Sequence, residues 1–551
     1  MTRAATSAAP VQSTAGVVPA WRSRTIAGAA LLPFVAILLA HTDIVPVFDS
    51  WLYTDCLTDA LVAAPDPRGL NCFGHPTAAY LLAVAIARFF APGWYGAVIV
   101  ANALLGAFAL LALRDIAALA FPGQDRALDR WLIVLAAGVH PVLLSSALNL
   151  NPDFGVTVFF LLTVRALLRG SVAGAALWGA ALTFSKEPGI VLYLLAAGLH
   201  TIMFVLPGPA EGRARRLLRL WPLAIPPALA LLFYATAAGV WLNPAQPSAP
   251  IADQVLRAPL DVFLAYSAAI LVLQFTWVPM VLIVGHLGLC ARAAVSRAPL
   301  PHSGVETYLW LLFGAAFIAL TRLPTFVNPR YFLPIAPLLL LCFASALGAL
   351  RPPRTAVRAT ALAGVALLFL ISAFRTVDPV SRALFGTFAF GDRQLLSITS
   401  LTHECCGSGR DQIVYNLEFT QFHRLVDQVY ERFPLESDAR YAADGLADWH
   451  LMGRIDARTR SRTIDRRDSS APSLCSADSI SVAAVKPRKL YFIDFPFLRP
   501  DRDLPKLAQT YDLTAAHQLD QGGYRLRVLE MERRHGSVEG PRSNLTAGGS
   551  R

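Results

Sequence analysis

The sequence predicts an α-helical polytopic membrane protein with about 11 transmembrane helices and a C-terminal exterior α/β domain. Of the 551 residues, 55% are hydrophobic and only 15% are charged, whereas about 25% is usual for soluble domains. Before residue 375, apolar runs long enough to cross a bilayer as helices recur. After it, strand-like and helix-like stretches alternate. These observations exclude a soluble globular enzyme, a disordered chain and a small disulfide scaffold.

The predicted membrane part is residues 25–375, which follow an N-terminal tail at residues 1–24. The run 76–90 is too short to be counted as a span, and we expect it to be a helix that lies at the membrane interface. Ala91-Pro92-Gly93 separates it from the next span. Residues 43–76 form the first outer loop. The expected spans are apolar runs of about 16 to 25 residues, near 25–42, 94–113, 131–148, 154–169, 171–185, 189–206, 220–241, 262–288, 305–321, 331–349 and 359–374.

The distribution of basic residues predicts the orientation. Residues 1–375 hold 24 Lys and Arg against 14 Asp and Glu, and residues 376–551 hold 24 against 23. The positive excess therefore lies between the apolar runs, which is typical of cytoplasmic loops and not of a nucleic-acid surface. With the N-terminus in the cytoplasm, 17 basic residues fall inside and 7 outside. The expected location is the cell (inner) membrane. An odd number of spans then places the C-terminal domain on its periplasmic or exterior side.

The alternative for the first apolar run is a cleaved signal peptide. No clear small-residue cleavage site precedes His41, and the segment before the run is long. We therefore expect the run to be retained as the first of the membrane spans.

The exterior domain is expected at residues 376–534. The stretches 412–416, 489–495 and 523–531 have the composition of strands, and 419–433 has helical spacing. This alternation predicts a small α/β domain. Residues 535–551 are rich in Gly, Ser and Arg, which is typical of a disordered tail.

Two cysteines fall in the first outer loop. Cys56 and Cys72 could close that loop with a disulfide in an oxidising compartment, and two thiols are the alternative. No Cys-x-x-Cys pair or His/Cys spacing typical of zinc sites is present in the sequence. No cofactor is therefore expected, although use of a divalent metal stays open.

Charged residues gather at the expected outer ends of the spans. Ionisable groups beside the bilayer are costly and are functional candidates by default. The alternatives are a solvated surface charge for the loop acids and a simple pair with Glu187 for Lys186, the only Lys before residue 486. The candidates are Asp43 and Asp49 in the first loop, Asp153 before the fourth span, Lys186 and Glu187 between the fifth and sixth, and Arg330 before the tenth.

Such a cluster suits a lipid-linked phosphate. Lysine offers a point charge and arginine a fork of donors to phosphate oxygens. Cations also stabilise a phosphate leaving group as its charge develops. A carboxylate nearby could take the proton of an incoming hydroxyl. One acid and one phosphate clamp at a membrane surface therefore suffice for glycosyl transfer from a lipid phosphate.

Five short motifs share this outer location: Phe48-Asp49-Ser50-Trp51-Leu52-Tyr53, Gly74-His75-Pro76-Thr77, Asn151-Pro152-Asp153, Ser185-Lys186-Glu187-Pro188 and Pro329-Arg330-Tyr331-Phe332-Leu333-Pro334. In order and spacing they resemble the GT-C superfamily of integral-membrane glycosyltransferases. The similar branch is that of the protein O-mannosyltransferases and the lipid A aminoarabinose transferase. The resemblance covers residues 25–350. Ser50 departs from the second acid, and Thr77 from the second proline, of the family's motifs.

The resemblance implies an inverting transfer of a sugar from a polyprenyl-phosphate donor to an acceptor hydroxyl on a protein, lipid or envelope glycan at the outer face. Asp49 would be the general base, with Asp43 as its rival, and Asp153 would position donor or acceptor. The residues that would hold the donor and its phosphate are Lys186 and Arg330, together with Tyr331, His75 and Glu187.

Two other classes stay open. A secondary transporter or lipid flippase would also have many spans, but transporters tend to place charges near the bilayer midplane and to show internal repeats. The sequence shows no convincing repeat, and its charges cluster at one surface. A non-catalytic assembly protein is the other class, because Ser50 breaks the acidic pair.

Overall fold

The computed structural model describes the helical part of the chain and most of a C-terminal sheet. The described residues are 20–41, 50, 53, 56–57, 72, 75–91, 93–207, 212–241, 267, 271, 277–296, 303–322, 329–349, 355–375, 380, 383–384, 387–390, 393–396, 417, 419–434, 438–443, 474–476, 487–494, 504–522 and 524–534.

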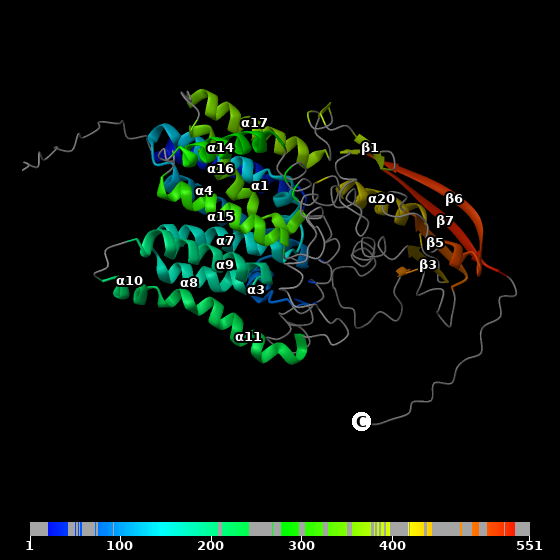
Figure 1. Ribbon diagram of the computed structural model, residues 1–551. Helices are drawn as coiled ribbons and strands as arrows, with labels where there is room; N and C mark the ends of the chain where they lie inside the picture. Colours follow the sequence, from blue (N-terminus) through cyan, green and yellow to red (C-terminus); the bar gives the residue numbers. More distant parts are fainter. Residues whose placement is uncertain are drawn as a thin grey trace, which may run out of the picture.

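The first part is a bundle of helices that run roughly alongside one another (Figure 1). The central helix is α7, which is buried along most of its length and packs against α4, α8 and α9. The helices are α1 (Ala20–Leu39), α3 (Ala78–Ala87), α4 (Gly93–Ala120), α5 (Ala127–Gly138), α6 (Pro141–Ala147), α7 (Pro152–Leu168), α8 (Val172–Thr183), α9 (Glu187–His200), α10 (Arg213–Arg219), α11 (Ile225–Trp241), α14 (Trp277–Val295), α15 (Gly304–Arg322), α16 (Ile335–Ala349) and α17 (Thr355–Phe374).

Short turns of tighter or wider helix adjoin the bundle helices. They are η3 (Gln124–Arg126), the π-helical turn η4 (Thr201–Val205), η5 (Trp221–Ala224) and η7 (Pro329–Phe332). Turn η7 matters for the site, because it leads directly into α16.

Four described helices are long and apolar enough to cross a membrane by themselves, and two bent helix pairs raise that number to six. The four lie in α4, α9 with η4, α15 and α17. Shorter apolar helices accompany them, and each of the eleven expected runs overlaps a helix. The polytopic helical class is therefore confirmed, while the number of eleven spans stays a prediction.

Two expected spans differ from the helices observed. The run 131–148 is divided into α5 and α6, which meet at an angle of 57°. The break precedes Pro141, which lacks an N–H group and whose ring disfavours helical conformation in the residue before it. In the run 262–288, α14 begins only at Trp277, and most of the earlier part lies outside the described residues.

The C-terminal part contains a five-stranded sheet in the order β4-β3-β5-β7-β6 and a separate β1–β2 hairpin. Strands β4, β3 and β5 are parallel, and β5, β7 and β6 are antiparallel. The strands are β1 (Thr387–Phe390), β2 (Arg393–Leu396), β3 (Ala439–Ala443), β4 (Leu474–Ser476), β5 (Lys489–Asp494), β6 (Tyr511–Gln521) and β7 (Tyr524–Arg533), with helices α20 (Phe419–Arg432) and α23 (Leu504–Leu507).

These elements match the sequence prediction in part. Strands β5 and β7 and helix α20 were expected, whereas β6, whose residues lack a clear alternating pattern, was not. The expected strand 412–416 and the tail 535–551 lie outside the described residues.

Helix α20 lies between the bundle and the sheet (Figure 1) and packs against β6 and β7. Just before it, the backbone N–H of Leu417 donates to the carbonyl of Ala373 at the end of α17, at 2.7 Å. Across the sheet, Glu530 accepts from Lys489 and contacts His517, both at 2.9 Å. The hydrogen bond from Lys489 lowers the pKa of Glu530 below its ordinary value.

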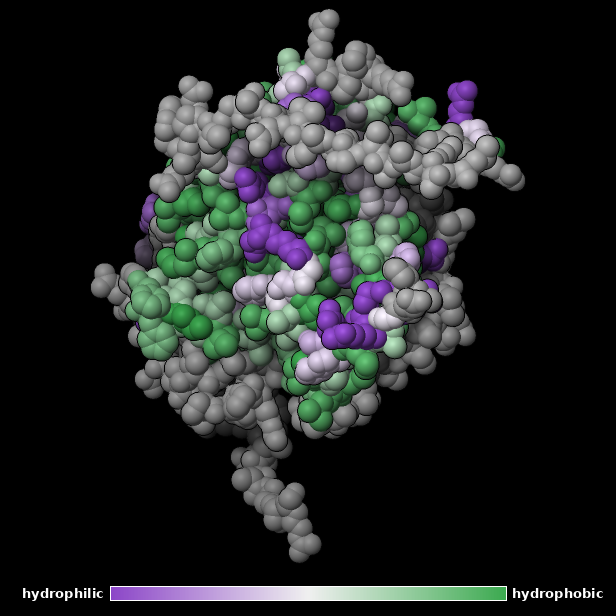
Figure 2. All heavy atoms as spheres, turned by 90° about the vertical axis from the view of Figure 1, so that its left-hand side faces the viewer, coloured by the Kyte–Doolittle hydropathy of each residue, from purple (hydrophilic) through white to green (hydrophobic). Residues whose placement is uncertain are grey.

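The bundle has two ends of different character. One end, which carries α3, is on the side of the bundle where α20 and the C-terminal sheet lie (Figure 1). The opposite end shows a band of hydrophilic residues across its middle, with apolar residues on either side (Figure 2). The two ends are therefore separate places where chemistry or binding could occur.

Candidate active site

Asp153 is the centre of the predicted cluster at the α3 end. Its Oδ2 atom lies 2.9 Å from the Lys186 Nζ atom and 3.3 Å from the Arg330 Nε atom. All three side chains are buried. The structure thus joins residues separated by up to 177 positions in one ion-paired group, in which two cations face one carboxylate.

Each member of this group lies at the start of a helix. Asp153 is in the first turn of α7, Lys186 is the N-cap of α9, and Arg330 is in η7, just before α16. The Asn151 side chain caps α7 by accepting from the Asp153 N–H at 3.0 Å. Helix N-termini carry partial positive charge and favour anions. Three converging N-termini and a net charge of +1 therefore make this end of the bundle suited to an anion.

Aromatic and titratable groups surround the cations. The Lys186 Nζ atom lies 4.6 Å from the centroid of the Tyr331 ring, and the Arg330 guanidinium carbon lies 5.4 Å from it. A cation over the face of an aromatic ring is attracted to it, so the Tyr331 ring helps to hold both cations in place. The His75 Nδ1 atom contacts Glu187 Oε1 at 2.8 Å, and both residues are partly exposed. They form the open side of the cluster.

The pairing of Lys186 differs from the alternative that the sequence suggested. Lys186 contacts Asp153 and not its neighbour Glu187, which contacts His75. Lys186 has an extended backbone before α9 (φ −177°). Successive side chains of an extended segment point to opposite sides, so the two neighbours reach different partners.

The first outer loop is described only in part. Asp43 and Asp49 lie outside the described residues, so their roles stay predictions. Ser50, which replaces the second acid of the family motif, is buried. Cys72 is buried in the main core and Cys56 packs against it, and the disulfide between them stays a prediction.

Sequence reasoning missed a buried polar network behind Asp153. The Tyr80 hydroxyl of α3 donates to Asn102 Oδ1 of α4 at 2.9 Å. The Asn102 amide donates to the carbonyls of Ala147 and Asn149, at 2.8 and 3.1 Å. These bonds hold the segment that leads to Asn151. A polar residue inside an otherwise apolar run was the signal, because Asn102 is the one amide side chain in the run 94–113.

Two glycines permit close approaches that position the site. A Cβ atom on Gly155 would lie 2.8 Å from the Tyr80 ring, so α3 packs directly on the first turns of α7. A Cβ atom on Gly189 would lie 2.1 Å from the carbonyl oxygen of Leu182. Gly189 therefore allows the tight turn between α8 and α9 that presents Lys186.

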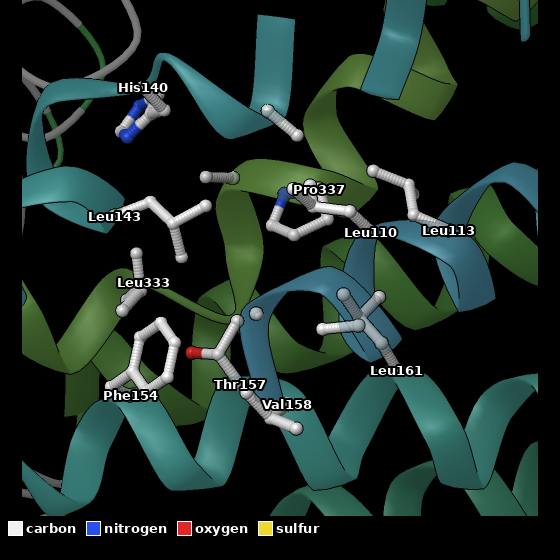
Figure 3. Close-up of a pocket in the computed structure, with 14 residues that line it drawn as sticks. Leu110, Leu113, His140, Leu143, Phe154, Thr157, Val158, Leu161, Leu333 and Pro337 are labelled. Atoms are coloured by element: carbon white, nitrogen blue, oxygen red, sulfur yellow. The ribbon is translucent and has the colours of Figure 1, made fainter. Parts of the chain in front are cut away.

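A small cavity of about 20 Å³ lies within the bundle, alongside the first turns of α7 (Figure 3). Leu143, Phe154, Leu333 and the methyl-bearing Thr157 side chain surround it, with His140 at one side (Figure 3). A water molecule needs at least about 10–15 Å³, so this space has room for one water and not for a sugar. A sugar bound beside Asp153 would therefore lie outside this cavity.

Among the described residues, no three His, Cys, Asp or Glu side chains gather in a way that could hold a metal ion. The buried cations beside Asp153, Lys186 and Arg330, are instead suited to an anion.

Fold and site together define a class: a polytopic helical membrane protein with buried, partly neutralised cations where several helices begin, as expected for the GT-C fold. Comparison with solved structures supports this class. The chain is similar to ArnT from Cupriavidus metallidurans bound to undecaprenyl phosphate, with a TM-score of 0.54 and 14% identity over 93% of this chain and 98% of ArnT. The apo structure of the same protein gives a TM-score of 0.54 and 15% identity over 92% and 98%.

At this identity the likeness concerns the fold, and it confirms the GT-C-like fold that the motifs predicted. No family model and no curated protein sequence matches the chain.

Proposed function

We propose that this protein is an inverting glycosyltransferase that moves a sugar from a polyprenyl-phosphate donor to an acceptor hydroxyl at the outer face of the membrane. The observation that carries the proposal is the pair of buried cations, Lys186 and Arg330, held by Asp153 at the start of α7. The fold shared with a protein crystallised with undecaprenyl phosphate supports a lipid phosphate as the anion.

Charge balance supports this ligand. Lys186 and Arg330 together with Asp153 carry a net charge of +1, which the single negative charge of a phosphodiester would neutralise. In the absence of donor, the negative charge of Asp153 offsets the repulsion between the two cations. When the bond between sugar and phosphate breaks, a second negative charge develops on the phosphate, and the two cations stabilise it.

The transfer itself needs one base. Asp49, in the first outer loop, would accept the proton of the acceptor hydroxyl while that oxygen attacks the anomeric carbon. The bond from this carbon to the phosphate oxygen breaks, and polyprenyl phosphate leaves. Because the attack comes from the face opposite the phosphate, the anomeric configuration inverts. His75 and Glu187, on the open side of the cluster, would contact the sugar.

Mass analysis of glycolipids and envelope glycans tests the proposal and identifies the sugar and acceptor. Cells that lack the protein should accumulate a glycosylated polyprenyl phosphate and lose one sugar from an acceptor. Expression of the wild-type chain should restore the sugar, and expression of Lys186→Ala should not. An unchanged set of glycans, with a changed distribution of lipid between the leaflets, would instead support the transporter or flippase.

The site is proposed to face outward, so we expect residues 376–551 to lie outside the cytoplasm. A reporter fused at residue 380 that functions only outside should be active, and a cytoplasmic reporter at the same position should be silent. The reason is the excess of arginine in the loops at the opposite end. Activity of the cytoplasmic reporter would place Asp153 and Lys186 on the inner side and contradict an outward-facing transferase.

A further inference from the structure

An arginine cluster lies at the end of the bundle opposite the candidate active site. Asp115 of α4 accepts from three guanidinium groups: Arg114 at 3.0 Å, Arg165 at 2.7 Å and Arg169 at 2.8 Å. The carboxylate is mostly covered, at 13% exposure, whereas the three arginine side chains are 35%, 35% and 47% exposed. Three positive charges thus cover one negative charge, and their outer sides face the surroundings.

The charge balance around Asp115 differs from that of a neighbouring group of ion pairs. At the same end, Arg126 and Arg358 contact two carboxylates, Asp125 and Asp129, so the charges of these four side chains balance, and the Arg358–Asp129 pair is buried. Their neighbour Arg130 donates to the backbone carbonyls of Phe121 and Gly123. Around Asp115 the balance is +2. The negative end of the α7 dipole offsets about half a charge. The Asp115 cluster therefore retains a clear capacity for an anion.

The position of Asp115 on α4 adds a second feature. Leu104, Phe108 and Leu111 are 57%, 59% and 38% exposed, and steps of four, three and four residues place them on one helix face with Asp115. At 1.5 Å per residue, the distance from Leu104 to Asp115 is about 16 Å. That length is close to half of a hydrocarbon core about 30 Å thick. An apolar stripe one leaflet long therefore ends at the arginine cluster.

We propose that this surface binds an anionic glycerophospholipid. The lipid phosphate contacts the outward N–H groups of Arg165 and Arg169, and an acyl chain lies along Leu104, Phe108 and Leu111. Guanidinium groups match the oxygens of a phosphate, and the excess charge distinguishes an anionic headgroup from a zwitterionic one. Helix α7 has 17 residues, so this surface is about 25 Å from Asp153, and the site is distinct from that of the sugar donor.

Lipid binding to the purified full-length chain tests the proposal. Native mass spectrometry in detergent would compare dioleoyl phosphatidylglycerol, dioleoyl phosphatidylcholine and inorganic phosphate. We expect phosphatidylglycerol to bind more tightly than the other two ligands. An arginine near a lipid surface contributes about 1 kcal/mol, so R165Q with R169Q should weaken phosphatidylglycerol binding roughly 30-fold. R215Q, at the exposed Arg215 on α10, is the matched control and should change nothing.

Two further variants separate lipid binding from a purely structural ion pair. D115N removes the competing carboxylate and should tighten phosphatidylglycerol binding, even if the melting temperature falls. F108S should weaken binding of both phospholipids and leave inorganic phosphate unaffected. Should the double arginine variant be unstable, R169Q alone serves, because that side chain is the most exposed of the three. Equal binding of the two phospholipids to the wild type, or unchanged binding in R169Q, would overturn the proposal.

Discussion

Replacing Lys186 by alanine is expected to slow sugar transfer by roughly 10²–10³-fold, the usual effect of losing one group that stabilises developing negative charge. The Nζ atom is buried beside Asp153 and Tyr331, so solvent screens its charge only weakly. Affinity for polyprenyl phosphate should fall in parallel. Lys186→Arg should keep part of the activity, because the charge remains while the planar fork differs from an ammonium. Rates and lipid affinities of purified variants measure both effects.

The chain offers a matched control for this substitution. Lys489 contacts Glu530 at 2.9 Å and lies 4.8 Å from the centroid of the Tyr491 ring. It therefore repeats the arrangement of a lysine, a carboxylate and a tyrosine in the C-terminal sheet, away from the proposed site. Lys489→Ala should leave transfer and lipid affinity unchanged.

A structural role for Lys186 makes a different prediction. If it only neutralises Asp153, either single substitution should lower stability, because breaking a buried pair costs about 3–5 kcal/mol when a charge is left uncompensated. The double variant Lys186→Met with Asp153→Asn should then recover stability and activity together. Normal donor affinity in that double variant would contradict the phosphate contact and leave Arg330 as the main phosphate ligand.

The second large effect concerns the base. Asp49→Asn is expected to reduce transfer by roughly 10²–10⁴-fold, since the amide cannot accept the proton of the acceptor hydroxyl. Binding of polyprenyl phosphate should stay close to wild type, because the base does not hold the phosphate. This separation of rate from donor affinity distinguishes Asp49 from Lys186, whose loss should affect both.

Two aspartates of the same loop serve as comparisons. Asp43→Asn should be milder, and Asp59→Asn, at a further aspartate of the loop, should behave as wild type. An inactive Asp43→Asn beside an active Asp49→Asn would reassign the base to Asp43. Full activity of both would exclude Asp43 and Asp49 as the general base.

Much of the site was visible as short motifs because membrane chains contain few charges. Lys186 and Asp153 each interrupt or begin an apolar run, and their burial beside hydrocarbon makes such residues rare without a role. Their partners were not visible. Lys186 has Glu187 as its neighbour in sequence, yet its contact is Asp153, 33 positions away. Tyr80 and Asn102 carry no motif and act through buried hydrogen bonds that only packing creates.

Helix periodicity and charge bias are local properties, and they follow from the order of residues alone. They specified a helical membrane protein, the approximate extent of its helices, and the elements β5, α20 and β7. Which side chains contact one another, and how deeply they are buried, are properties of the folded chain. The α5–α6 break needed Pro141 in its packed context, and three helix N-termini converge on Asp153 only when α7, α9 and α16 assemble. The positive excess around Asp115 likewise arises only where α4 and α7 meet, because Arg165 and Arg169 come from α7. No local pattern in the sequence indicates this meeting.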